Sequence, residues 1–391
     1  MTNWLGKKSE EIDICLIVEG SYPYVQGGVS AWTHKIIQAF PKYRFGIIFL
    51  GSLPQYYTSG PKYQLPPNVV YFAMHYLFNA ESAPARHIKV KTENFVEMAT
   101  FHEMLREDRE NPQGITGDLD FYLDPSKKIT EEQFLYSEAS WDYITDQYSR
   151  FSTEPSFIDY FWTVKNIHQP MWVLPKIIDT LPPLKVVHTL STGYAGFLGA
   201  LLHDRFGYPL ILSEHGIYTK ERRVEIISSS IFRDINFMQE DIVNISYLRT
   251  LWNNFFESLA KTCYGAAEPI VSLFEGAHRI QLEYGVDDAK TSIIPNGIDI
   301  DHYEQFVRSF QDKAHPIIGF IGRIVSIKDV KTLIRAMVLI KQNMENAQLW
   351  IIGSADEEPQ YAQECEDLIV SLDLQDAVKI MPNQDLSSIF P

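Results

Sequence analysis

The sequence predicts an α/β protein of two domains, each built on a parallel sheet. Three observations support this class: a length of 391 residues, an apolar content of 45%, and apolar runs that alternate with helical patterns along most of the chain. A chain of this length is too long for one compact core and can bury two. Strands that are buried on both faces read as continuous apolar runs, as in parallel sheets covered by helices.

The first elements form a βαβ unit of the Rossmann kind. Residues 13–18 (DICLIV) are an apolar run that predicts a buried parallel strand. A glycine-containing loop leads into a segment with helical spacing of its apolar residues, namely Val29, Trp32, Ile36, Ile37 and Phe40. Residues 45–51 (FGIIFLG) repeat the strand pattern, so strand, helix and strand follow in the order of a Rossmann-like domain.

The middle of the first domain departs from this alternation. Residues 52–169 are rich in tyrosine and proline and predict an insertion, with helices near residues 92–109 and 130–150. Its aromatic residues favour packing onto the domain, while an acceptor or partner surface stays open as an alternative. Beyond it, the pattern predicts strands at 185–189, 209–214 and 270–273, helices at 193–206, 233–264 and 275–284, and a last strand and turn in TSIIPNGIDID.

A polar break at residues 311–316 (QDKAHP) predicts the linker, with the first domain over residues 1–312 and the second over 313–391. The second domain restarts a βαβ series at IIGFIGR, followed by strands in AQLWIIGSADE and AVKIMPN. Ser326 is the expected N-cap of its first helix, which buries Val330, Leu333, Ile334 and Met337. About half of a Rossmann-like domain is present here, so we expect a fragment or a shortened product.

The charge balance limits the classes of partner. A net charge of −16 disfavours nucleic acid, which needs many Lys and Arg side chains, and also disfavours adsorption to anionic lipid. Three distant cysteines, with no CxxC spacing, fit a reducing compartment and show no metal pattern. The N-terminus has no signal-peptide pattern, and no apolar stretch approaches the ~18 residues that span a bilayer. We therefore expect a soluble, cytoplasmic protein that does not insert into a membrane.

Two short stretches suggest sites for an anion. Gly27 and Gly28 directly precede the first helix, where backbone N–H groups and the helix dipole can bind a negative ligand. Turn chemistry alone is the more frequent reason for such a pair, and no GxGxxG dinucleotide pattern is present. In GFIGRIVSIKDVKTLI, Arg323 and Lys328 lie between a strand and a helix, at the edge where α/β sheets bind ligands. Solvation of Lys328 beside Asp329 is the alternative interpretation.

The motifs GGVSAW, SEHGIY, IPNGID and GRIVSIKDVKTLI, in this order, resemble glycosyltransferase family 4, whose members have the GT-B fold. The longer stretches VEGSYPYVQGGVSAWTHKII, HTLSTGYAGFLGALL and SEHGIYTKERR narrow the resemblance to the family 4 enzymes of bacterial Pel exopolysaccharide biosynthesis. The resemblance implies two Rossmann-like domains that face each other across a cleft, with the acceptor in the first and the nucleotide-sugar in the second. It also implies retention of configuration at the transferred sugar, without a metal or other cofactor.

The resemblance gives the candidate residues their roles. Arg323 and Lys328 match the pair that binds the donor diphosphate, where leaving-group charge develops, and Gly28 matches the glycine whose backbone approaches it. His215 matches a histidine near the donor sugar. The donor is expected to be UDP-glucose or a UDP-N-acetylhexosamine, and the acceptor a growing polysaccharide. Synthase components of the inner membrane are implied as partners that would recruit the chain to the cytoplasmic face of that membrane.

Other polar residues have weaker assignments. His188 ends a predicted strand, where a hydrogen bond in the core explains it as well as ligand contact does. Asn296, in IPNGID, is either a turn residue or a substrate contact. The charged residues 220–223 are expected in a loop, solvated or near acceptor or phosphate. Two DxD triplets are attributed to chance rather than to a metal site, and their carboxylates are Asp118, Asp120, Asp299 and Asp301.

The sequence also departs from family 4. The later E-x7-E motif of that family, whose carboxylates contact the donor sugar and the ribose, has no counterpart here. We therefore expect the 391-residue chain to be weakly active or inactive. A non-catalytic subunit that binds a nucleotide-sugar stays open as the alternative, while an epimerase is disfavoured because GxGxxG and YxxxK patterns are missing.

Overall fold

The computed structural model of the chain describes residues 4–5, 11–78, 88–106, 129–153, 156–228, 247–298, 300–304, 316–382 and 384. The chain divides into two compact units, Met1–Asn296 and Gly297–Pro391. Each unit has its own sheet and its own hydrophobic core. The predicted boundary between residues 312 and 313 lies outside the described residues.

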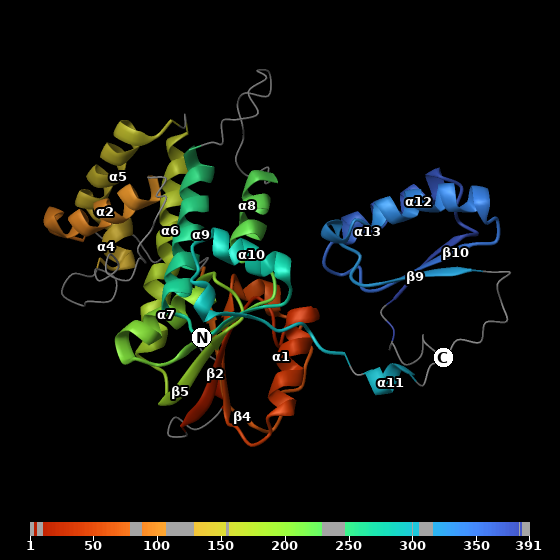
Figure 1. Cartoon of the computed structure of the whole chain (residues 1–391). Helices are drawn as coiled ribbons and strands as arrows, with labels where there is room; N and C mark the ends of the chain where they lie inside the picture. The colour runs from red at the N-terminus through yellow and green to blue at the C-terminus, as the bar shows by residue number, and fades with distance from the viewer. Residues whose placement is uncertain are drawn as a thin grey trace. The chain divides into compact units, whose positions relative to one another are not determined.

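In the first unit, the described strands form one sheet (Figure 1). Their spatial order is β1 (Trp4–Leu5), β4 (Val69–Tyr76), β3 (Phe45–Gly51), β2 (Ile12–Glu19), β5 (Leu184–Thr189), β6 (Leu210–Glu214), β7 (Ile270–Ser272) and β8 (Thr291–Ile293). All neighbouring pairs are parallel except β1 with β4. The strand order reverses between β2 and β5, which creates a crevice at their carboxyl ends, the place where open α/β sheets bind ligands.

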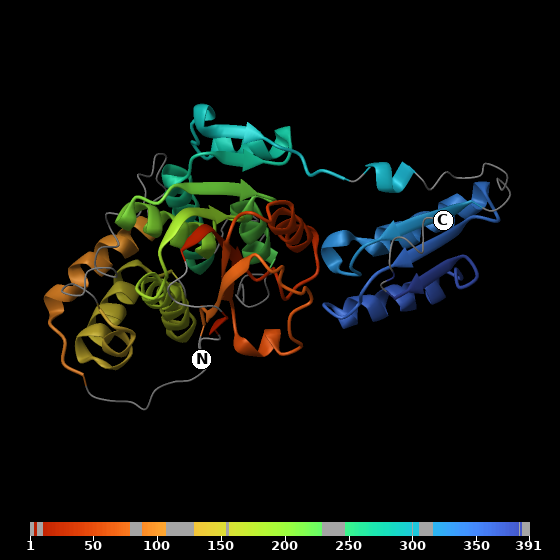
Figure 2. The same cartoon turned by 90° about the horizontal axis from the view of Figure 1, so that it is seen from below.

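Both faces of this sheet are covered, because successive side chains of a strand point to opposite sides. On one face, Leu16 and Val18 of β2 pack in a cluster with Ile37 of α1 (Gly28–Ala39). On the other face, Cys15 and Ile17 belong to a larger cluster with α7 (Tyr194–Phe206) and α9 (Tyr247–Ala266). Figures 1 and 2 show α1 and α7 on opposite sides of β2. Burial on both faces explains why the strands read as continuous apolar runs.

A group of helices stands beside α9: α2 (Phe95–Arg106), α4 (Glu131–Tyr136), α5 (Glu138–Phe151) and α6 (Phe157–Ile178) (Figure 1). Side-chain caps fix three of the starts. Thr130 forms a capping box with Gln133 at α4, Ser137 caps α5 and Ser156 caps α6. The helices expected near residues 92–109 and 130–150 are confirmed, within the described residues.

The expected insertion over residues 52–169 differs from the structure at both ends. Residues 69–76 are not part of an insertion, because β4 pairs with β3 in parallel along its whole length. At the other end, α6 runs through residue 169 to Ile178. Tyrosines and prolines around β4 obscured the strand pattern of VVYFAMHY, and Pro170 and Pro175 lie inside α6, where proline usually signals a helix end.

Among the described residues, the first unit also contains α8 (Tyr218–Ser228), α10 (Glu275–Glu283) and short 3₁₀ turns at Pro54–Tyr57, Thr92–Asn94 and Asp288–Lys290. The prediction of a loop at residues 220–223 is wrong, because these residues lie in α8. The sequence TKERRVE has no apolar periodicity, so pattern reasoning missed the helix. The expected helix at 233–264 is described only from Tyr247, and residues 233–246 lie outside the described residues.

The second unit contains a parallel sheet of β11 (Val378–Met381), β10 (Gln348–Ile352) and β9 (Ile317–Ile321). Two helices, α12 (Val330–Asn343) and α13 (Pro359–Ser371), pack together and share its core. The core contains Ile334, Met337, Leu349, Ile351 and Cys365. The short helix α11 (Ile300–Glu304) precedes this sheet in the chain. The strands and helices expected in this part of the sequence are confirmed.

The start of α12 corrects one prediction. Ser326 is not the N-cap, because residues 326–328 form a separate 3₁₀ turn and α12 begins only at Val330. Asp329 separates the two with a left-handed backbone (φ 48°, ψ 46°), which no right-handed helix can pass through. Lys328 therefore lies at the end of this 3₁₀ turn, just before α12. The neighbouring Gly353 allows close backbone packing, since a Cβ there would overlap the carbonyl oxygen of Gly322.

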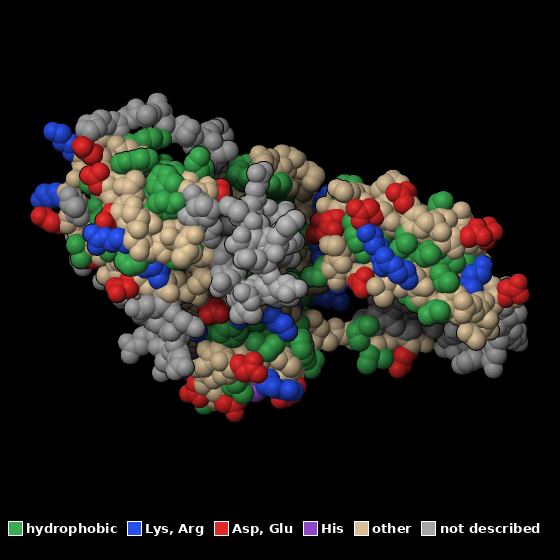
Figure 3. Space-filling view, turned by 90° about the horizontal axis from the view of Figure 1, so that it is seen from above, with side chains coloured by type: hydrophobic (Ala, Val, Ile, Leu, Met, Phe, Trp, Pro, Cys, Tyr) green, Lys and Arg blue, Asp and Glu red, His purple; other side chains and the backbone are tan. Residues whose placement is uncertain are grey.

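Surface properties of the described residues agree with the charge composition. On the face in Figure 3, acidic and basic side chains are interspersed among the coloured residues and form no continuous basic surface. Within the described part of the chain, no helix is long and apolar enough to cross a membrane. Cys15, Cys263 and Cys365 are free and buried.

Candidate functional site

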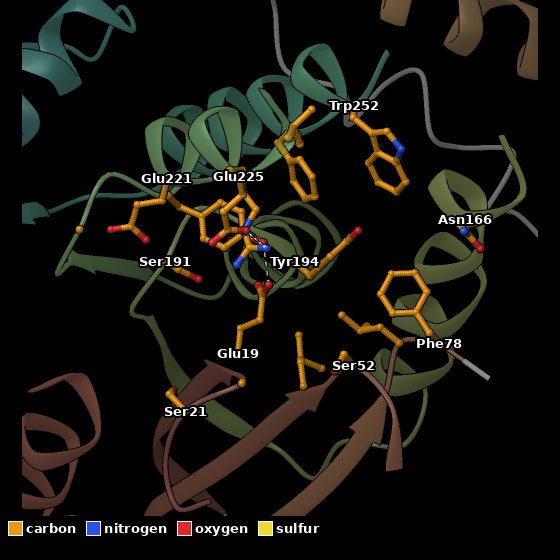
Figure 4. A pocket seen from close by; sticks show the side chains of 18 of the residues that line it. Glu19, Ser21, Ser52, Phe78, Asn166, Ser191, Tyr194, Glu221, Glu225 and Trp252 are labelled. Atoms are coloured by element: carbon orange, nitrogen blue, oxygen red, sulfur yellow. Dashed lines mark hydrogen bonds and ion pairs between the residues drawn. The ribbon is translucent and has the colours of Figure 1, made fainter. Parts of the chain in front are cut away.

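A cavity of about 860 Å³ lies in the first unit, at the carboxyl edge of its sheet. Its floor comes from residues at or just beyond the ends of five strands, namely Glu19, Leu50, Leu77, Ser191 and His215. Helices α6, α8 and α9 supply the walls (Figure 4). The cavity therefore occupies the crevice that the reversal of strand order creates.

Glu19, the last residue of β2, is the central polar group of the floor. Its carboxylate accepts hydrogen bonds from the backbone N–H of Ala195 (3.2 Å) and from the Tyr218 hydroxyl (2.7 Å). Ala195 lies in the first turn of α7, whose dipole favours a negative group. Burial raises the pKa of Glu19, while the Tyr218 hydroxyl and the Arg222 charge lower it. Sequence reasoning missed this residue; its signal is a carboxylate at the end of an apolar strand.

Helix α8 brings further charge into the cavity. Arg222 forms an ion pair with Glu225 (Nη1 to Oε2, 2.8 Å), and its guanidinium lies 5.1 Å from the centre of the Tyr218 ring. The buried Nε of Arg222 has no hydrogen-bond partner among the described residues. Burial lowers the pKa of Arg222, but the nearby Tyr218, Glu225 and Glu19 groups raise it overall. This buried N–H group can donate a hydrogen bond to a ligand oxygen.

His215 follows β6 and lines the cavity, as its strand-end position suggests. Its ring packs edge-on against Trp32 with a centroid distance of 4.7 Å. Its Nε2 is buried and has no hydrogen-bond partner among the described residues. Burial lowers the pKa of His215, which favours the neutral ring. Neutral imidazole can donate or accept one hydrogen bond at this nitrogen, so His215 suits recognition of a hydroxyl group.

The buried carboxyl group of Glu214, at the end of β6, connects the elements around His215. Glu214 is 1% exposed and accepts four hydrogen bonds, from Thr192 Oγ1 (3.3 Å), Tyr218 N (3.4 Å), Tyr264 Oη (2.8 Å) and Gln281 Nε2 (2.9 Å). Burial raises the pKa of Glu214 and these hydrogen bonds lower it. The network connects β6 to the loop after β5 and to α8, α9 and α10. It therefore fixes the position of the adjacent His215.

His188 is buried behind the cavity and is not one of its lining residues. Its Nε2 lies 2.9 Å from Ser213 Oγ, and its ring packs edge-on against Trp32 at 5.9 Å. Burial, together with the charge of His215, lowers the pKa of His188 to about 4. Trp32 thus contacts both predicted histidines, but only His215 is open to the cavity.

His188 is expected to make the stability of the chain pH-dependent. Because its pKa falls from 6.5 to about 4 on folding, its stabilising contribution is complete above pH 6.5 and is lost as the pH falls towards 4. One pKa unit corresponds to about 1.4 kcal/mol. Urea unfolding at pH 7.5 and pH 4.5 should show that His188→Gln loses roughly 2 kcal/mol less stability than the wild type. Equal losses in both proteins would contradict this.

Gly27 and Gly28 lie at the start of α1, as predicted. Gly27 is the N-cap with an extended backbone (φ 171°), and no side chain caps the helix. No atom lies within 4 Å of a Cβ added at either glycine, so neither packing nor a left-handed backbone requires glycine here. The next residue, Val29, lines the cavity. Asn296, also predicted as a site residue, is exposed and is the last residue of the first unit.

The second unit carries the two predicted cations just beyond β9. Arg323 forms an ion pair with Glu357, and the backbone N–H of Ser326 donates to Glu358 (3.0 Å). Both carboxylates lie directly before α13. Lys328 is exposed and has no ion-pair partner among the described residues. The loop after β9 therefore binds two carboxylates, and its second cation, Lys328, has no ion-pair partner among the described residues.

No set of three or more His, Cys, Asp or Glu side chains in the described residues is arranged to hold a metal ion. Asp118, Asp120 and Asp299, from the two DxD triplets, lie outside the described residues. Asp301 is in the first turn of α11. The absence of a metal from the reaction stays a prediction.

Two protein-family models match the chain, one over each part of the sequence. A model described as a domain of unknown function, DUF3492, matches residues 12–289 and thus more than half of the sequence. The chain belongs to the DUF3492 family. The model for glycosyl transferases group 1 matches residues 302–390. The protein is a group 1 glycosyltransferase, an enzyme that uses a nucleotide-sugar donor.

Solved structures resemble the chain only distantly. Anabaena Alr3699/HepE, in complex with UDP and glucose, has 12% identity and a TM-score of 0.46, with 96% of this chain and 70% of that chain covered. The catalytic domain of Arabidopsis thaliana starch synthase IV, bound to ADP and acarbose, has 11% identity and a TM-score of 0.44, with 97% and 76% covered. The galactosyltransferase WaaB of the lipopolysaccharide outer core has 10% identity and a TM-score of 0.43, with 97% and 70% covered. No curated protein is a significant match.

The predicted fold class is confirmed. The chain has the α/β organisation of the GT-B class, with a parallel sheet in each of two units and a short second unit that the group 1 model matches. The predicted enzyme class, a glycosyltransferase, is confirmed as well. The roles of His215, His188, Gly27, Gly28, Asn296, Arg323 and Lys328 stay predictions.

Proposed function

We propose that the chain transfers a sugar from a UDP-sugar to a growing exopolysaccharide, with retention of configuration, as a PelF-type enzyme of Pel biosynthesis. The observation that carries the donor assignment is the pair of cations just beyond β9, Arg323 and Lys328, in the unit that the group 1 model matches. Transfer leaves a nucleoside diphosphate, whose developing charge needs cations at fixed positions. Glu357 and Glu358 already place carboxylate oxygens in the loop, which supports its ability to bind anions.

Two features of the first unit support the same reaction. Gly27 and Gly28 leave open space at the start of α1, so a ligand can approach the backbone N–H groups of that helix. His215 presents a buried, unpartnered Nε2 at the cavity, within the described residues, and we assign it a hydrogen bond to a hydroxyl of the reacting sugar. His188 then supports Trp32 and His215 from behind, while Asn296 contributes through the segment that leaves the first unit.

The Pel assignment extends the proposal to partners and location. The motifs that narrow the sequence resemblance, including SEHGIYTKERR, contain His215 and the cavity residues Tyr218, Glu221 and Arg222. A PelF-type enzyme would work with synthase components of the inner membrane at the cytoplasmic face. UDP-glucose and UDP-N-acetylhexosamines are the donors to test first.

Calorimetric titration of the chain with UDP, UDP-glucose, UDP-N-acetylglucosamine and NAD tests the donor class. UDP and one UDP-sugar are expected to bind, while NAD is not. A coupled assay for released UDP, with and without polysaccharide acceptor, then measures transfer. Binding of NAD in preference to UDP would contradict the proposal. Turnover by these 391 residues is expected to be weak, because the E-x7-E carboxylates have no counterpart in them. Failure of every UDP-sugar to bind would contradict the proposal.

Glu357 competes with the donor in this proposal, since its carboxylate occupies the guanidinium of Arg323. The pair is about a third to a half exposed, so breaking it costs about 0.2–1 kcal/mol. Glu357→Gln is therefore expected to tighten UDP binding by about two- to fivefold in a calorimetric titration. Glu366→Gln serves as the control and should leave the affinity unchanged, because Glu366 is exposed on α13 and the described ion pair of Arg323 is with Glu357. Weaker UDP binding by Glu357→Gln would contradict the competition.

A further inference from the structure

The wall of the cavity that α6 provides carries one aromatic and three polar side chains. Asp159, Trp162, Thr163 and Asn166 all line the cavity, and their spacing of three, one and three residues places them on one helical face. This face combines one indole ring with a carboxylate, a hydroxyl and an amide group. None of these four residues belongs to the group around Glu19 and His215 described above.

Helix α9 adds two aromatic rings to this wall. Trp252 and Phe256, four residues apart, both line the cavity and stack on each other with a centroid distance of 5.6 Å and an interplanar angle of 20°. Phe78, just beyond β4, adds a third ring. In Figure 4, Trp252, Phe78 and Asn166 lie on one side of the cavity, and Glu221 and Ser191 lie on the other. The cavity therefore has an aromatic side and a charged side.

The chemistry of the aromatic side fits a sugar ring better than an alkyl chain. The C–H face of a pyranose packs on an aromatic ring, while its hydroxyl groups need hydrogen-bond partners at the ring edge. Asp159, Thr163 and Asn166 provide such partners beside Trp162. An alkyl chain would remove these polar groups from water and give no hydrogen bond in return, which is unfavourable for each group that it buries.

The size of the cavity sets how many rings it can take. At about 860 Å³ it lies near the upper end of the ~300–1,000 Å³ range of ligand pockets, several times the volume of one pyranose ring. One sugar at Glu19 and His215 would leave the aromatic side unfilled. The geometry therefore has room for at least one further ring of the same acceptor.

We propose that the α6–α9 wall is an acceptor subsite for an internal sugar ring, so that the enzyme recognises an oligosaccharide of two or more rings. This inference rests on the proposed function, because it takes the acceptor end to be at Glu19 and His215. Trp252 and Trp162 stack on the internal ring, and Asn166 binds one of its hydroxyls. The subsite selects for acceptor length and leaves donor binding unchanged.

The test is a binding titration followed by quenching of tryptophan fluorescence. The probes are β-1,4-linked N-acetylglucosamine oligomers of one to four rings, the matching glucose oligomers, and octyl β-glucoside as a single sugar with an alkyl chain. The dissociation constant is expected to fall by about tenfold from one ring to two, as one well-packed stacking contact provides roughly 1.4 kcal/mol. Octyl β-glucoside is expected to bind no more tightly than the single ring.

Substitutions identify the side chains that produce the gain in affinity from the second ring. Trp252→Ala is expected to remove the gain from the second ring without weakening single-ring binding, and Asn166→Ala to remove part of it. Trp141→Ala is the matched control, because Trp141 is 55% exposed on α5 and does not line the cavity. Far-ultraviolet circular dichroism of each variant checks that it is folded, and UDP titration checks the donor site.

The possible outcomes separate this inference from the proposed function. Equal affinity for one and two rings, a length gain that persists in Trp252→Ala, or no binding by any oligomer overturns the subsite. Tighter binding of octyl β-glucoside than of the disaccharide also overturns it and assigns the aromatic side to an alkyl chain. If the wild type does not bind UDP, the proposed donor is wrong. An affinity that rises with the number of sugar rings, and that depends on Trp252, would still support a glycan subsite.

Discussion

Arg323→Ala is expected to weaken UDP binding by about ten- to a hundredfold, because a charge-assisted hydrogen bond to a diphosphate contributes about 1.5–3 kcal/mol. Arg323 follows β9 directly, where its side chain already binds a carboxylate, that of Glu357. Arg323→Lys keeps the charge but loses the planar fork, so an intermediate affinity is expected. Calorimetric titration with UDP gives the dissociation constants.

Lys328→Ala is expected to weaken UDP binding as well, by about tenfold, since Lys328 lies in the same loop and offers a point charge. Arg335→Ala is the matched control, because Arg335 is exposed on α12 further along the chain and lies outside this loop. Its affinity for UDP should equal that of the wild type. Unchanged affinity in both Arg323→Ala and Lys328→Ala would show that the donor binds elsewhere.

The sequence predicted best those elements in which the apolar residues form a clear run or repeat. β3 was predicted at its observed bounds, and β5, β6 and β7 within one residue at either end. β3 is buried along its whole length and has no polar residue, while β5, β6 and β7 carry their polar residues at or near their ends, so each still contains an apolar run. Element order alone then predicted a Rossmann-like sheet, and position at strand ends selected His215 and Arg323.

The parts that the sequence did not predict depend on tertiary contacts. Helix α8 has few apolar residues to show a period, yet Tyr218 anchors it by its hydrogen bond to Glu19, nearly two hundred residues earlier. Gly193 shows the same dependence, since a Cβ there would overlap the Tyr218 ring. No local pattern contains such information. Glu19 was overlooked for this reason, although it lies at the centre of the cavity floor.

The start of α12 shows how a single backbone conformation changes an expectation. Ser326 has the side chain of a typical N-cap, and its position before an apolar period made that role plausible. In the structure its backbone N–H and its hydroxyl both bind Glu358 instead. The left-handed Asp329 then resets the chain direction before α12. Carboxylates from a neighbouring loop decided the local structure, and the sequence around Ser326 does not contain them.

Glu214→Ala is expected to be the most destabilising substitution at the site, with a loss of about 3–5 kcal/mol in the free energy of unfolding. Its carboxyl accepts hydrogen bonds from Thr192, Tyr218, Tyr264 and Gln281, all four of them buried. Removing the acceptor leaves these donors without a partner in the core, and a cavity replaces the lost side chain. Urea unfolding measures the loss.

Glu214→Gln separates the hydrogen bonds from the volume. Its amide fills the same space and keeps one acceptor oxygen, but its NH₂ group meets donors such as Gln281 Nε2, so a smaller loss than in Glu214→Ala is expected. Glu283→Ala on α10 is the control, because an exposed glutamate should change stability by no more than about 0.5 kcal/mol. Since Glu214 fixes the neighbouring His215, both Glu214 variants should also reduce sugar transfer under conditions in which they remain folded. A folded Glu214→Ala with wild-type stability and turnover would show that the network does not position the site.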